Sequence, residues 1–172
     1  YSNRTIIGSI QWAHPPSMTP MQQVHAHELP PSLDAIADRY DTVVGVRDRF
    51  LWKWFHHLNP YFRLSSVDRD YESKVRNDKS LLTFYITLLD DLVDERNDQN
   101  TFEEAVKIPF AHQSIDFDRP DIDEGALGLA YEMWDEFERS IRRAPRFEEF
   151  RGLLRFDLLQ AMNAVRYGYV AN

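Results

Sequence analysis

One long helical pattern, from about Asp70 to Glu95, constrains the fold of this chain more than any other feature of its sequence. Apolar residues recur in it at the three- and four-residue spacing of an amphipathic α-helix: Val75, Leu81, Leu82, Tyr85, Ile86, Leu89 and Val93. Such a helix must bury its apolar side against other elements of the domain. Because no alternating strand pattern with hairpin turns accompanies it, we expect an all-α fold.

Shorter helical patterns lie on both sides of the long one. We expect these helices at about 32–40, 43–58, 101–107, 124–143 and 147–170. Ser32 is a plausible N-cap for the first, and Thr101 with Glu104 has the form of a capping box for the short one. Pro60 and Pro145 follow the ends of two others. The chain thus predicts a bundle of helices.

The amino-terminal part of the chain differs from the rest. Five prolines interrupt it, and each blocks helix continuation: Pro15, Pro16, Pro20, Pro30 and Pro31. We therefore predict an irregular arm at 1–32 and a single helical domain at 33–172.

Composition excludes several classes of protein. The net charge of -8 argues against general nucleic-acid binding, which needs a basic face. With a mean hydropathy of -0.52, charges interrupt every apolar stretch, so we expect no transmembrane segment. The absence of cysteine excludes disulfides, thiolate zinc sites and cysteine nucleophiles, and it is compatible with the cytoplasm, where we expect the protein.

Three aspartates gather at the carboxyl end of the long helix: Asp90, Asp91 and Asp94. Asp90 and Asp94 are four residues apart, so on a helix they stand on one face and repel each other. Magnesium would relieve this repulsion, because it binds a few carboxylate oxygens together with waters and phosphate oxygens. Asp91, rotated by about 100°, can serve as an outer or bridging acceptor. The alternative is an acidic helix end that is simply solvated.

This segment, Asp90-Asp91-Leu92-Val93-Asp94 after an apolar helix, resembles the aspartate-rich DDxxD motif of the class I terpenoid synthases, or terpene cyclases. The resemblance covers about Leu81 to Asp98. It implies a helical bundle of that family, with Asp90, Asp91 and Asp94 as ligands of Mg2+ and Asp90 and Asp94 as the catalytic pair. It further implies a lyase of isoprenoid biosynthesis that ionises a prenyl diphosphate and cyclises the resulting carbocation.

The same resemblance suggests residues that bind substrate. Family members carry a diphosphate-sensing arginine downstream of the first motif, near a glycine at a helix break. Arg166, with Gly168 after it, is the candidate here, and Arg155 is a rival. Phe84 and Tyr85 precede the aspartates, and aromatic rings of this kind suit a pocket that stabilises carbocations by cation–π attraction.

The second metal motif of the family, (N/D)Dxx(S/T)xxxE, is not found in this sequence. Asn97-Asp98 begins one, but Ala105 stands where its acid should be. We therefore expect the chain to be the N-terminal part of such a bundle. A trans-prenyltransferase is one alternative, although Arg96 stands alone where those enzymes typically have paired arginines. A non-catalytic helical interaction protein with an acidic patch is the other, and a homodimer is compatible with either.

Overall fold

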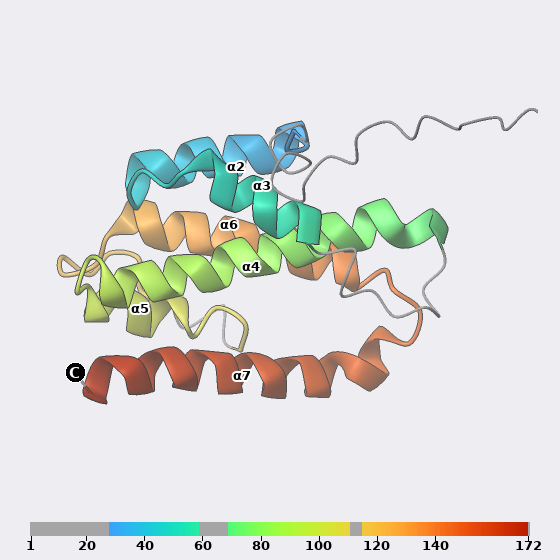
Figure 1. Ribbon diagram of the computed structural model, residues 1–172. Helices are drawn as coiled ribbons and strands as arrows, with labels where there is room; N and C mark the ends of the chain where they lie inside the picture. Colours follow the sequence, from blue (N-terminus) through green and yellow to red (C-terminus); the bar gives the residue numbers. More distant parts are fainter. Residues whose placement is uncertain (1–27, 59–68, 111–114, 172) are drawn as a thin grey trace, which may run out of the picture.

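A computed structural model describes residues 28–58, 69–110 and 115–171 of the chain, and the side chains of 28–58, 69–110 and 115–168 (Figure 1). Within these ranges it has no strand, so the all-α prediction is confirmed. The helices are α2 (Pro31–Val43), α3 (Arg49–Leu58), α4 (Glu72–Asp94), α5 (Gln99–Ala105), α6 (Glu124–Ile141) and α7 (Phe147–Ala171), with a short 3-10 helix at Arg69–Tyr71.

Helix α4 lies at the centre of the bundle. It packs against α3, α5, α6 and α7, and Figure 1 shows α2 and α3 on one side of it and α5 and α7 on the other. Six of its apolar side chains are at most 2% exposed: Leu81, Phe84, Tyr85, Leu88, Leu89 and Leu92. Burying each such side chain contributes roughly 1.5–3 kcal/mol. The apolar side of α4 is therefore the main part of the core.

Two predicted helix starts are wrong for local reasons. The helix expected from Val43 begins only at Arg49, because the chain first turns through Gly45, whose φ of 155° is rare for residues with a side chain. The short helix is capped by Asp98 instead of Thr101: the Asp98 carboxylate accepts a hydrogen bond from the N–H of Thr101 at 3.1 Å. The segment 44–48 thereby becomes a loop beside α4.

The carboxyl end of α4 falls immediately after the aspartate cluster. The chain reverses at Asn97, which has a φ of 52°, and the N–H of Asp98 donates to the carbonyl of Leu92 at 2.7 Å. Asp98 therefore does not extend the row of Asp90 and Asp94. These two carboxylates lie on the last two turns of α4, and both are exposed.

The predicted irregular arm falls almost wholly on residues 1–27, outside the described residues. Of its last residues, 28–30 have no regular secondary structure, but 31 and 32 already belong to α2, so the arm ends two residues earlier than predicted. Pro31 begins α2 at a helix position where proline is well tolerated. No helix in the described part of the chain is long and apolar enough to cross a membrane.

Candidate functional site

The last two turns of α4 carry aspartates on two different faces. Asp90 and Asp94 are exposed, whereas Asp91, one residue along, is 4% exposed. The difference follows from helix geometry, because Asp91 shares its face with Leu88 and Phe84, three and seven residues earlier. Those two residues are completely buried, so the helix turns Asp91 toward the core, whereas Asp90 and Asp94 face water.

The buried carboxylate of Asp91 is held by two other elements. Arg47, in the loop between α2 and α3, donates to both of its oxygens, from Nε at 2.9 Å and from Nη2. The hydroxyl of Tyr40, a fully buried residue of α2, donates to Oδ2. Burial and this hydrogen bond raise the pKa of Tyr40, so its hydroxyl stays protonated as a donor. These contacts correct the prediction that Asp91 is a metal ligand: it binds side chains of the fold instead.

Asp90 and Asp94 are not bound in this way. Neither forms an ion pair or a side-chain hydrogen bond with any residue that the structure describes. Partial desolvation raises the pKa of Asp90, and the neighbouring Asp94 and Asp91 carboxylates raise it further. The pair thus has the repulsion that the four-residue spacing predicts, and the nearby Arg47 charge offsets only part of it. A bound cation would relieve it.

The face of α4 that leads to Asp90 and Asp94 is not the one predicted to bind substrate. Phe84 is completely buried and packs on Trp52, with ring centroids 4.3 Å apart. Tyr85 is 1% exposed, packs on Trp134 and donates to the carbonyl of Ala105 at 2.8 Å. Both are core residues, so the prediction that they contact substrate is wrong. They were predicted as substrate contacts because they precede the aspartates in the sequence, but their position around the helix axis places them on its buried side.

Four half-buried residues share the face of the exposed carboxylates: Leu82, Thr83, Ile86 and Thr87. Leu82 and Ile86 are part of the apolar pattern predicted from the sequence, whereas Thr83 and Thr87 were missed. Ile86 precedes Asp90 by four residues, and Leu82 precedes Ile86 by four, so they form one row along the helix. Counting back from Asp90 in steps of three and four would have found the two threonines as well. The carboxylates therefore stand at the end of an uncharged, partly apolar strip.

Arg166 is engaged elsewhere in the bundle. It lies on α7 and donates to both carboxylate oxygens of Glu103 on α5, at 2.9 and 2.6 Å. Its guanidinium also lies over the ring of Phe102, 5.8 Å from the centroid. The structure records no contact between Arg166 and the aspartates. In this structure Arg166 joins α7 to α5.

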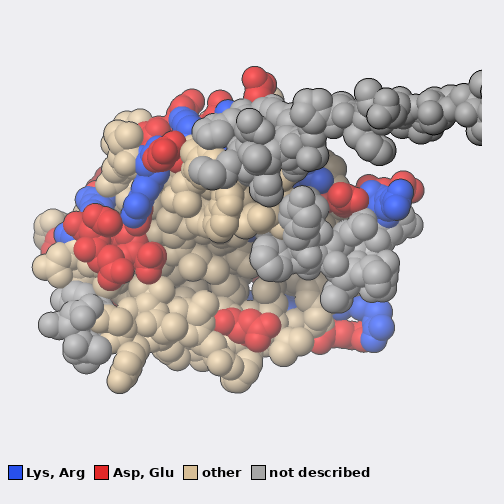
Figure 2. Space-filling model, in the orientation of Figure 1, with Lys and Arg blue, Asp and Glu red and all other residues tan. Residues whose placement is uncertain are grey.

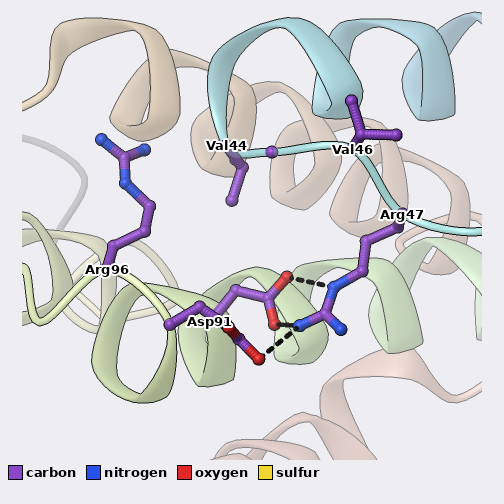
Figure 3. A pocket seen from close by; sticks show the side chains of 7 residues that line it. Val44, Val46, Arg47, Asp91 and Arg96 are labelled. Carbon is purple, nitrogen blue, oxygen red and sulfur yellow. Dashed lines mark hydrogen bonds and ion pairs between the residues drawn. The ribbon is translucent and has the colours of Figure 1, made fainter.

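A small cavity of about 160 Å³ adjoins the aspartate cluster on the side of Asp91. It is lined by Val44, Gly45, Val46, Arg47, Asp91, Glu95 and Arg96. In Figure 3, Asp91 points from α4 toward Arg47, while Arg96 is directed away from this pair. Asp90 and Asp94 do not line this cavity.

Acidic side chains gather on the surface where α4 ends (Figure 2). Even so, within the described ranges no three histidine, aspartate or glutamate side chains come together as a set that could hold a metal ion. An ion at this place would be held by the carboxylates of Asp90 and Asp94 alone, with its other positions open. Such a two-carboxylate set suits Mg2+, which usually keeps several waters and takes its remaining ligands from phosphates.

No protein-family model matches this chain, and no curated protein or solved structure matches it either.

Proposed function

We propose that this chain carries the first metal-binding helix of a magnesium-dependent terpene synthase, which ionises a prenyl diphosphate and cyclises the carbocation. The observation that supports the proposal is the pair Asp90 and Asp94: two exposed carboxylates, four residues apart, with no partner among the described side chains. Aspartate is unfavourable in a helix and has the wrong charge for its carboxyl end. Residues that break such local rules together tend to mark functional sites.

The electrostatics of this helix end favour a cation. The last carbonyls of α4 give its carboxyl end a partial negative charge, and Asp94 is its final residue. The two carboxylates supply hard oxygen ligands, which Mg2+ prefers over nitrogen or sulfur. When bound, magnesium would neutralise charge on a departing diphosphate.

The protein's own part in this proposal divides between two groups of residues. Asp90 and Asp94 bind and orient the ion, and through it the diphosphate group. The strip of Leu82, Thr83, Ile86 and Thr87 offers an uncharged surface to the hydrocarbon chain beside it. Substrate length and product skeleton would depend on how much of this strip the substrate covers.

The direct test is consumption of farnesyl and geranylgeranyl diphosphate by the full-length protein with magnesium. Replacing Asp90 by alanine should lower turnover by about a hundredfold or more while changing substrate affinity less, since it removes charge stabilisation needed as the bond breaks. Asp157 is an exposed aspartate on α7, so Asp157→Ala is the matched control and should keep full activity. Full activity in Asp90→Ala would rule the proposal out.

A helical interaction protein is the second candidate, and α7 favours it. Leu153, Phe156, Leu159 and Tyr167 are 45–75% exposed on this helix. Exposed apolar side chains on one helix are typical of contact surfaces. One simple measurement distinguishes the two functions. Magnesium with diphosphate should raise the melting temperature of the protein only if the metal site exists.

A further inference from the structure

The contacts of Asp91 join three separate segments at the point where the exposed carboxylates stand. Tyr40 comes from the last turn of α2, Arg47 from the following loop, and Asp91 from α4. Arg47 is itself fixed at its backbone, where its N–H donates to the Asp41 carboxylate at 3.1 Å. The rotation of the end of α4 about its axis is therefore set from outside the helix.

This rotation decides where Asp90 and Asp94 point. All three residues are on one helix, so a rotation of this helix end about its axis turns Asp90, Asp91 and Asp94 by the same angle. A guanidinium that donates through two nitrogens fixes the plane and direction of the carboxylate, which a single point charge cannot do. Partners of this kind, one step removed from a metal, typically change its affinity by about 10- to 100-fold.

We propose that Arg47, assisted by Tyr40, is a positioning residue for the metal site: through Asp91 it sets the orientation of Asp90 and Asp94. This inference rests on the proposed function of that pair. Arg47 touches neither exposed aspartate, and its remaining contact is with the exposed Glu95 at 3.7 Å. The Arg47 charge also acts on Asp90 through space and lowers its pKa. Loss of that charge alone would strengthen cation binding, so a weaker affinity in an Arg47 variant would come from the geometry of α4.

A matched control lies at the same end of the helix. Arg96 ties the end of α4 to the carbonyl of Val43 at 3.0 Å and to Asp123 at 2.5 Å. Its side chain thus anchors the same helix end to α2 and to the N-cap of α6 without touching the Asp91 carboxylate, and only its backbone N–H meets Asp91, donating to the carbonyl at 3.0 Å. If Arg47 only stabilised the fold, replacing Arg47 or Arg96 would change metal affinity to a similar extent. If Arg47 positions the aspartates, replacing it should weaken metal binding more than replacing Arg96 does.

The experiment measures binding of Mn2+ by electron paramagnetic resonance, with inorganic diphosphate present, at a temperature where circular dichroism shows every variant folded. Arg47→Met should weaken Mn2+ affinity by about tenfold or more. Arg47→Lys should restore part of this affinity, because lysine keeps the positive charge but lacks the planar guanidinium that donates through two nitrogens. Tyr40→Phe should cause a smaller loss, and Arg96→Met should stay within about twofold of the wild type.

Two negative results have different meanings. If the wild-type protein and its Asp90→Asn variant bind Mn2+ equally, the proposed function fails and the inference fails with it. A second result would overturn only the positioning role. In it, Asp90→Asn weakens Mn2+ binding, but the Arg47 and Tyr40 variants keep the wild-type affinity or lose no more affinity than Arg96→Met. If Arg47→Met does not fold, Arg47→Lys and Tyr40→Phe decide the question.

Discussion

Asp91 and its neighbours Asp90 and Asp94 have the same chemistry and opposite surroundings. Asp91 is buried, and Arg47 and Tyr40 donate hydrogen bonds to it. Asp90 and Asp94 are exposed and unpaired among the residues that the structure describes. A buried carboxylate must have partners, because an uncompensated charge in the interior is strongly destabilising. An exposed pair has no such requirement, so its repulsion can persist until a cation binds.

The largest difference between the two faces of α4 should be seen in stability. Phe84→Ala removes a completely buried ring and should lower the free energy of unfolding by about 3–5 kcal/mol. Ile86→Ala acts on the half-buried strip beside Asp90 and should lower it by only about 1–2 kcal/mol. Urea unfolding of the two variants measures both values. Equal losses would mean that the strip is as buried as the core, which would leave no surface for a substrate.

Replacing the buried Asp91 by alanine should cause the next largest loss of unfolding free energy. Breaking a buried ion pair typically lowers stability by about 3–5 kcal/mol, because one charge remains without its partner. The side chain of Arg47 is 32% exposed, so water partly solvates it and we expect about 2–3 kcal/mol for Asp91→Ala. Chemical denaturation measures this value. A loss below about half a kilocalorie, which is usual for surface positions, would place Asp91 with the exposed pair.

In the absence of a divalent cation, Asp94→Asn should act in the opposite direction. It removes a like-charge contact at four-residue spacing, which destabilises an isolated helix by roughly 0.2–0.5 kcal/mol. A slight gain in unfolding free energy, measured in a chelating buffer, is therefore expected. A loss of a kilocalorie or more would show that Asp94 has a stabilising partner in the folded protein.

The pH dependence of stability should show the smallest effect. Desolvation and the adjacent carboxylates raise the pKa of Asp90 above its usual 3.8. The folded state then holds this proton more tightly than the unfolded state, so the stabilising contribution is present below pH 3.8 and is lost as pH rises through the folded pKa. Relative to wild type, Asp90→Asn should become more stable across this mildly acidic window and level off above it. A difference that is flat, or that falls with pH, would contradict the shift.

The fold was largely predictable because helical spacing dominates this sequence. The long pattern before Glu95 predicts α4 closely, and its central place follows from its length. The loop at 44–48 was missed because the apolar residues on both sides of Gly45 match a continuous helix. Only the backbone angle of Gly45 reveals the turn.

The candidate site was predictable in part. The spacing of Asp90 and Asp94 is enough to place them on one face, because α4 is regular there. The partners of Asp91 were not predictable: Arg47 is 44 residues away in the chain, and only the packing of the α2–α3 loop on α4 brings it close. Phe84 and Tyr85 were misassigned although their helical phase, shared with buried leucines, indicates the core.

The central claim is that Asp90 and Asp94 bind magnesium together with diphosphate. Its most direct test is the melting temperature of the protein with both present, compared with the Asp90→Asn/Asp94→Asn double variant. At about a hundred times the dissociation constant, binding adds roughly 2.7 kcal/mol to stability. For a chain of this size, the wild-type melting temperature should then rise by roughly 5–10 °C. The double variant should show no rise, and an unchanged wild type, or an equal rise in both, would contradict the claim.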